Sequence, residues 1–140
     1  MKNFLSLLSL LTLVMACNPT NDQPRVDPIF EIGQPFVLAF GQVASCSCAA
    51  PDVKFVHVIT DSRCPLQAEC VWAGEVVVEL EINEQLVRLG LSPIQTAPAK
   101  DIIGMWSYEL LAVNPHPLVP LMEDEIDECI YTLELLIEAL

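Results

Sequence analysis

The chain has 140 residues, of which 53% are hydrophobic, and its 19 acidic residues against 6 basic ones give a net charge of −13 at pH 7. This length suits one domain after removal of a targeting segment, and the apolar content argues against a disordered chain. Such acidity also argues against a nucleic-acid partner and against electrostatic binding to anionic lipid headgroups, because both need clustered Lys and Arg.

The first residues have the features of an export signal. Lys2 precedes an apolar run over 4–15, which is shorter than the about 20 residues that a membrane-spanning helix needs. The sequence VMAC ending at Cys17 resembles a lipobox, which implies a signal peptide over 1–16 and lipid (palmitate among its acyl chains) on Cys17. The alternative is an ordinary cleaved signal followed by an incidental cysteine.

The predicted location is therefore the bacterial cell envelope, with the membrane bound through the lipid. Asn18 follows the predicted lipid-attachment residue, whereas some two-membrane bacteria use an aspartate there to keep lipoproteins at the inner membrane. Asn18 is thus compatible with the outer membrane. Residues 17–32 are rich in proline and predict an extended tether, and 33–140 predict one β-domain.

From residue 36 onward the hydrophobic pattern has period two, which is typical of strands. The clearest segment predicts a buried face and a solvent face, made respectively by Val76, Val78, Leu80 and Ile82 and by Glu75, Glu79 and Glu81. A tight turn at 82–85 extends this strand into a hairpin over 75–91.

Four other segments complete the predicted sheet. Residues 36–44 are apolar on both sides and predict one strand with both faces covered. In the segment over 53–60, Val53, Phe55, His57 and Ile59 share a face. In the segment over 105–113, Trp106, Tyr108 and Leu110 alternate with Ser107 and Glu109. Residues 126–140 fit either a helix or a strand, and Tyr131 and Thr132 favour the strand, with Cys129, Tyr131, Leu133, Leu135 and Ile137 inward. About six strands joined by proline-rich turns predict an all-β fold, a small antiparallel sandwich or barrel.

Five cysteines remain after Cys17, and in an exported domain the default is disulfide bonding. Cys64 and Cys70 bracket a short loop and predict a mutual bond, with Trp72 covering the sulfurs and Gly74 permitting a bend or a close approach. Arg63 is expected to pair with Asp61 or to lie on the Trp72 ring. Cys48 with Cys129 is the candidate second disulfide. Alternatively Cys46 and Cys48, with His57 or Cys129, are weak candidates to hold a soft metal.

The stretch DSRCP, four residues, Cys70, then VWAG resembles a group of small exported bacterial lipoproteins of unknown function. The group carries Asp-Ser-Arg-Cys-Pro, a short gap and Cys-x-Trp-Ala-Gly. The likeness extends over most of 33–138, although only 61–74 is specific. It implies a β-rich domain and no particular activity.

The sequence contains no recognisable catalytic motif and calls for no cofactor. The acidic run over 123–128 lacks the alternating ligands and glycine of a calcium loop, so a solvated loop is expected. His57 and His116 are not paired with a nucleophile in any motif. The first hypothesis is a non-catalytic binding or structural accessory module with an unidentified protein or small-molecule partner. The alternatives are an envelope metal-binding protein using the CSC cysteines and, more weakly, a hydrolase.

Overall fold

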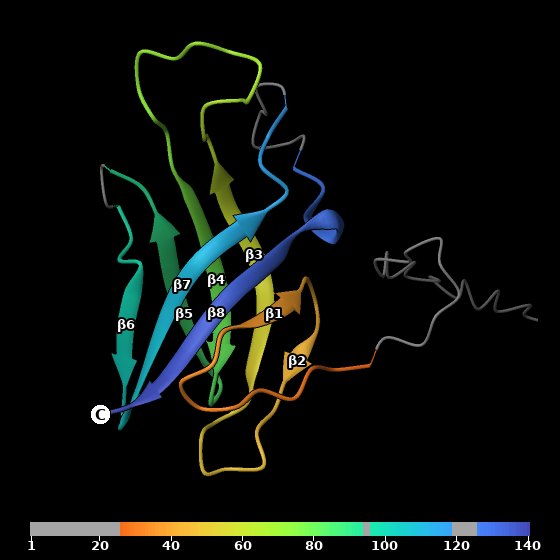
Figure 1. Ribbon diagram of the computed structural model, residues 1–140, viewed down its shortest axis with the longest axis vertical. Coiled ribbons are helices and arrows are strands. Elements are labelled where there is room, and N and C mark those ends of the chain that lie inside the picture. Colours follow the sequence, from red (N-terminus) through yellow and green to blue (C-terminus); the bar gives the residue numbers. More distant parts are fainter. Residues whose placement is uncertain (1–25, 94–95, 119–125) are drawn as a thin grey trace, which may run out of the picture.

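The computed structural model describes residues 26–93, 96–118 and 126–140, which form two facing four-stranded antiparallel sheets (Figure 1). The predicted signal peptide, Cys17 and the first half of the acidic run, 123–125, lie outside these residues. One sheet has the order β1 (Phe36–Ala39), β8 (Thr132–Ala139), β7 (Trp106–Asn114), β6 (Lys100–Ile103). The other has the order β2 (Val43–Ala44), β3 (Val53–Asp61), β4 (Val76–Ile82), β5 (Gln85–Leu91). The predicted all-β sandwich is confirmed, with eight strands among the described residues and a 3-10 helix, η2 (Glu128–Ile130).

The predicted β-hairpin and its buried face are confirmed in β4 and β5. Val76, Val78, Leu80 and Ile82 are all fully buried between the sheets. Asn83 and Glu84 form the turn with φ values of 52° and 62°, the left-handed conformation that a two-residue hairpin turn requires. The period-two pattern therefore sets the register of the central strand pair.

The predicted exposure of Glu79 is wrong. Glu79 is 7% exposed, because Arg88 lies directly opposite on β5 and places its Nε 2.9 Å from the Glu79 carboxylate. Val77 on the same outer face is also buried, and the nearby loop is tied to β5 by a hydrogen bond from the Gly90 N–H to the Pro98 carbonyl. A charge can be buried here because its ion-pair partner is supplied by the adjacent strand.

The expectation of a single strand over 36–44 is also wrong. The segment divides into β1 and β2, which belong to different sheets. Between them Gly41 has a φ of 76°, and the Gln42 N–H donates to the Ala39 carbonyl in a tight turn. Val37 is 59% exposed, so one face of β1 is open to solvent.

Two register shifts in β3 overturn the predicted common face of Val53, Phe55, His57 and Ile59. They fall between Phe55 and His57 and between Val58 and Thr60. Val53 and Phe55 are buried, but His57 and Ile59 are exposed and Val58 points inward instead. Each bulge inserts an unpaired residue and thereby exchanges the two faces of the strand. As a result, Asp61 at the end of β3 faces the interior.

The strand expectation for the C-terminus is confirmed. Tyr131, Leu133, Leu135 and Ile137 are buried against the second sheet, although Cys129 lies exposed on η2. On β7, Tyr108 and Leu110 are buried as predicted, while Ser107 is buried as well. No helix within the described ranges is long and apolar enough to cross a membrane.

Candidate functional site

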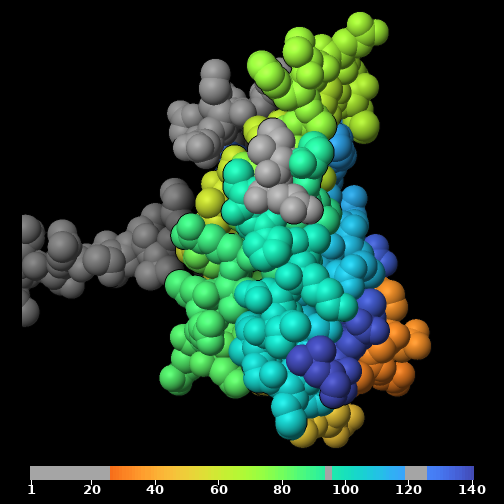
Figure 2. Space-filling model, turned by 90° about the vertical axis from the view of Figure 1, so that its left-hand side faces the viewer, coloured from red at the N-terminus to blue at the C-terminus, as the bar shows by residue number. Residues whose placement is uncertain are grey.

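The segment over 62–75, here called the stapled loop, joins β3 to β4 and extends beyond one end of the sandwich (Figures 1 and 2). The structure places the Cys64 and Cys70 sulfurs at disulfide distance, with the Cα atoms 5.8 Å apart. This agrees with the predicted pairing and with the usual Cα separation of bonded cysteines. The bond closes the loop on itself but does not attach it to the sandwich.

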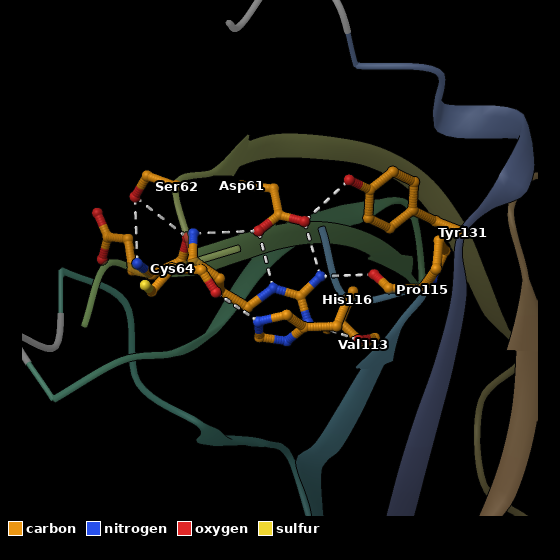
Figure 3. A network of polar contacts seen from close by, with 9 residues as sticks. Asp61, Ser62, Cys64, Val113, Pro115, His116 and Tyr131 are labelled. Atoms are coloured by element: carbon orange, nitrogen blue, oxygen red, sulfur yellow. Dashed lines mark hydrogen bonds and ion pairs between the residues drawn. The ribbon is translucent and has the colours of Figure 1, made fainter. Parts of the chain in front are cut away.

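A buried ion pair attaches the loop to the sandwich (Figure 3). Asp61 is 3% exposed, and its carboxylate accepts hydrogen bonds from Arg63 Nε at 2.8 Å and Nη2 at 2.7 Å. The predicted Asp61–Arg63 pairing is thus confirmed, in a bidentate form that fits the planar guanidinium. Tyr131 Oη donates to the same carboxylate at 2.8 Å from the opposite sheet. Burial raises the pKa of Tyr131, and the Asp61 hydrogen bond raises it further, so the hydroxyl remains a donor.

The remaining Arg63 donors reach the end of β7 and the residue that follows it. Nη1 donates to the Val113 carbonyl at 2.7 Å, and Nη2 donates to the Pro115 carbonyl at 2.8 Å. One guanidinium therefore joins the end of β3 to the end of β7 in the other sheet. The sequence offered Asp61 as one of two expected partners for Arg63, the other being the Trp72 ring, and no sequence signal pointed to Tyr131 or to these two carbonyls.

Further contacts fix the base of the stapled loop. His116 Nε2 lies 2.8 Å from the Cys64 carbonyl, and because a carbonyl only accepts, this nitrogen carries the proton. The Leu66 N–H donates to the Pro117 carbonyl at 3.1 Å. At the other end of the loop, a Cβ on Gly74 would lie 1.8 Å from the Ser62 carbonyl oxygen, so only glycine fits the observed backbone there. The predicted close approach at Gly74 is confirmed.

The outer part of the stapled loop is apolar and faces solvent. Leu66, Val71 and Trp72 are 68%, 90% and 77% exposed, respectively. The predicted cover of Trp72 over the sulfurs is therefore wrong. Between the two cysteines the loop has one charged side chain, Glu69. A segment with a fixed base and an exposed apolar tip can bind an apolar surface or pocket on a partner.

The other predicted site residues lie apart from this loop. Cys46 and Cys48 are between β2 and β3, and their sulfurs are at disulfide distance from each other, so the candidate Cys48–Cys129 bond is wrong. The reason is geometric, because a loop with one intervening residue brings the two side chains together. His57 Nδ1 lies 3.3 Å from Glu128. Across residues 26–93, 96–118 and 126–140, no group of three His, Cys, Asp or Glu side chains could hold a metal.

Two surface hollows lie on the sheet that contains β3 and β4. One, of ≈ 280 Å³, is beside the β4–β5 turn, and the other, of ≈ 470 Å³, is over the outer face of β3 to β5. Neither is lined by His57 or His116. The polar histidine pocket that a hydrolase would need is thus not found at either hollow.

Comparison with known proteins finds no family model, no curated protein and no solved structure that matches this chain. A function has therefore to be inferred from the chemistry of the chain itself.

We expect the buried ion pair to show strong coupling between its partners. Arg63→Met should lower the free energy of unfolding by about 3–5 kcal/mol, because it leaves the Asp61 carboxylate buried without a countercharge. Asp61→Leu combined with Arg63→Met should cost less than the sum of the two single changes. Urea unfolding of the four proteins measures the coupling. Additive effects would show that the pair is energetically independent.

A matched control separates the cost of the steric contact at Gly74 from the cost of its positive φ. Gly33 also has a positive φ, of 78°, but a Cβ there would meet nothing within 4 Å. Gly33→Ala should therefore cost only the conformational term, about 1–2 kcal/mol. Gly74→Ala should cost clearly more, because the Ser62 carbonyl must also move. Equal losses in thermal unfolding would contradict the predicted steric contact.

Proposed function

We propose that the protein is a lipid-anchored module of the bacterial cell envelope that binds a partner through the stapled loop. The export signal and the VMAC sequence support anchoring through Cys17. Two cysteine pairs at disulfide distance fit an oxidising compartment outside the cytoplasm. In this proposal the protein acts as a non-catalytic binding or structural accessory.

The binding role is inferred from the contrast between the fixed base of the stapled loop and its exposed apolar tip. The base is held by Arg63, His116 and the Cys64–Cys70 pair, so the loop does not need to order itself when it binds. The tip nevertheless keeps Val71 and Trp72 in solvent. Trp is enriched among the residues that dominate binding energy at protein interfaces, and an exposed Trp on a rigid support is well suited to that role.

The acidic surface indicates what kind of partner fits. Arg63 is paired with Asp61, Arg88 with Glu79, and Lys100 with both Glu109 and Glu138. Three of the four Lys and Arg side chains in the described residues are thus paired with carboxylates, and the chain as a whole keeps a net charge of −13. A partner surface with an apolar pocket and a basic rim would complement the apolar tip and this charge.

The anchor is tested by cell fractionation. Cys17→Ser should move the folded protein from the membrane to the soluble fraction, because the lipid is the proposed attachment. Asn18→Gln is the matched control, since it changes the next residue but keeps the acylated cysteine, and it should stay with the membrane. Retention of the Cys17→Ser protein after a high-salt wash would contradict the anchor.

The binding surface is tested by a photo-crosslinking residue at position 72 in the full chain, in intact cells. Leu86, which is 59% exposed beside the turn at the opposite end of β4, is the control position. We expect a discrete adduct from position 72 and none from position 86. The adduct should weaken when Val71 and Leu66 are both changed to Ser, while the unfolding midpoint stays nearly unchanged. Equal labelling from both positions, or no adduct from position 72, would contradict the proposal.

A further inference from the structure

The short loop over 45–51, here called the CSC loop, lies at the end of the sandwich opposite to the stapled loop. It leads into the start of β3, whereas the stapled loop follows the end of the same strand (Figure 1). Within it the Cys46 and Cys48 sulfurs are bonded across a sequence separation of 2, with the Cα atoms 5.0 Å apart. Neither this bond nor this end of the molecule has a part in the proposed binding role.

Stabilisation of the fold does not account for the bond. A disulfide stabilises mainly by restricting the unfolded chain, and this restriction shrinks with the length of the loop that is closed. Here only Ser47 lies between the cysteines. The start of the CSC loop is already fixed, because Ser45 exchanges hydrogen bonds with the carbonyl of Pro28 and the N–H of Phe30. The bond therefore connects no parts of the protein that would otherwise separate.

The surroundings of the two sulfurs differ in a way that suits disulfide exchange. Cys48 is exposed, so its sulfur is open to an attacking thiolate. Cys46 is half-buried against the hydrophobic core, and its sulfur accepts a hydrogen bond from the Cys48 N–H at 3.1 Å. A hydrogen bond to this sulfur stabilises the thiolate that Cys46 becomes when the bond opens, which makes Cys46 the better leaving group. Apart from the cysteines, residues 45–51 carry no ionisable side chain that would repel a thiolate.

We propose that Cys46 and Cys48 form a thiol–disulfide exchange site that accepts electrons from accessible dithiols. A substrate thiolate attacks the Cys48 sulfur, the Cys46–Cys48 bond breaks, and Cys46 leaves as a thiolate that takes up a proton. The second thiolate of the substrate then attacks the substrate sulfur of the mixed disulfide and releases Cys48 as its thiolate. The substrate is oxidised to a disulfide by two electrons, the cysteine pair is reduced by the same two, and the two substrate protons end on Cys46 and Cys48.

The Cys64–Cys70 pair provides an internal control in the same molecule. The full-length protein in detergent is treated with dithiothreitol, a neutral dithiol, and is then alkylated at intervals, and the two cysteine pairs are quantified by mass spectrometry of their peptides. Cys48 and Cys70 are both exposed, so the two pairs differ in the leaving sulfur. Cys46 accepts a hydrogen bond from the Cys48 N–H, whereas the Cys64 sulfur lies beside the carbonyl oxygens of Pro65 and Ala68, which do not stabilise a thiolate. We therefore expect Cys46–Cys48 to open at least about tenfold faster than Cys64–Cys70. Equal or slower opening of Cys46–Cys48 would overturn the proposal.

Two variants separate exchange from a structural role. In Cys46→Ser, Cys48 should form a mixed disulfide with oxidised glutathione faster than Cys46 does in Cys48→Ser, because only Cys48 is exposed. The double variant with both cysteines changed to Ser should keep the unfolding midpoint of the wild type, unlike the matched double variant at Cys64 and Cys70. A large loss of stability in the Cys46/Cys48 double variant, or equal reactivity of the two single thiols, would show that the bond is a structural staple and that the proposed exchange site is wrong.

Discussion

The bidentate ion pair between Asp61 and Arg63 is the contact on which the rest of the site depends. Asp61 is buried, and a buried carboxylate is stable only when its charge and its lone pairs are satisfied. Arg63 does so from the stapled loop and Tyr131 from the position before β8, and Arg63 also binds the carbonyls of Val113 and Pro115. Because the carboxylate and the guanidinium together bind all these groups, the end of β3, the end of β7, the start of β8 and the start of the stapled loop are fixed relative to one another.

This arrangement explains how an apolar loop can remain extended in solvent. Without the ion pair, the contacts of His116 and the close approach of Gly74 to Ser62, exposed Leu, Val and Trp side chains would be expected to collapse onto the sandwich. The Cys64–Cys70 pair restricts the conformation within the loop, while Arg63 attaches the loop to the sandwich. The two constraints are complementary, because a disulfide between neighbouring residues restricts only the chain that it encloses.

The two cysteine pairs therefore have different physical roles at opposite ends of one strand. One pair lies in a loop that is hydrogen-bonded to the segment after β7 and presents an apolar tip. The other closes a single intervening residue beside backbone that is already fixed. If both proposals hold, the proposed binding surface and the proposed exchange site lie at opposite ends of the sandwich, so that a partner at the stapled loop would leave the CSC loop accessible.

The sequence by itself determined the all-β class, the β4–β5 hairpin and the inward face of β4. It favoured a strand over a helix for β8 and a mutual Cys64–Cys70 pair, and it offered Asp61 as one of two partners for Arg63. These features depend on residues that are close in the chain or on an unbroken period of two. Only the tertiary structure decided that Asp61 faces inward, that Glu79 is buried, that 36–44 divides between two sheets and that Cys48 pairs with Cys46. The reason is that bulges in β3 exchange its faces without a sequence signal, and that Tyr131, which completes the buried Asp61 site, comes from a segment that is near it only in the folded protein. Arg88 faces Glu79 across the β4–β5 hairpin, but only the folded structure shows that the outer face of β4 is covered.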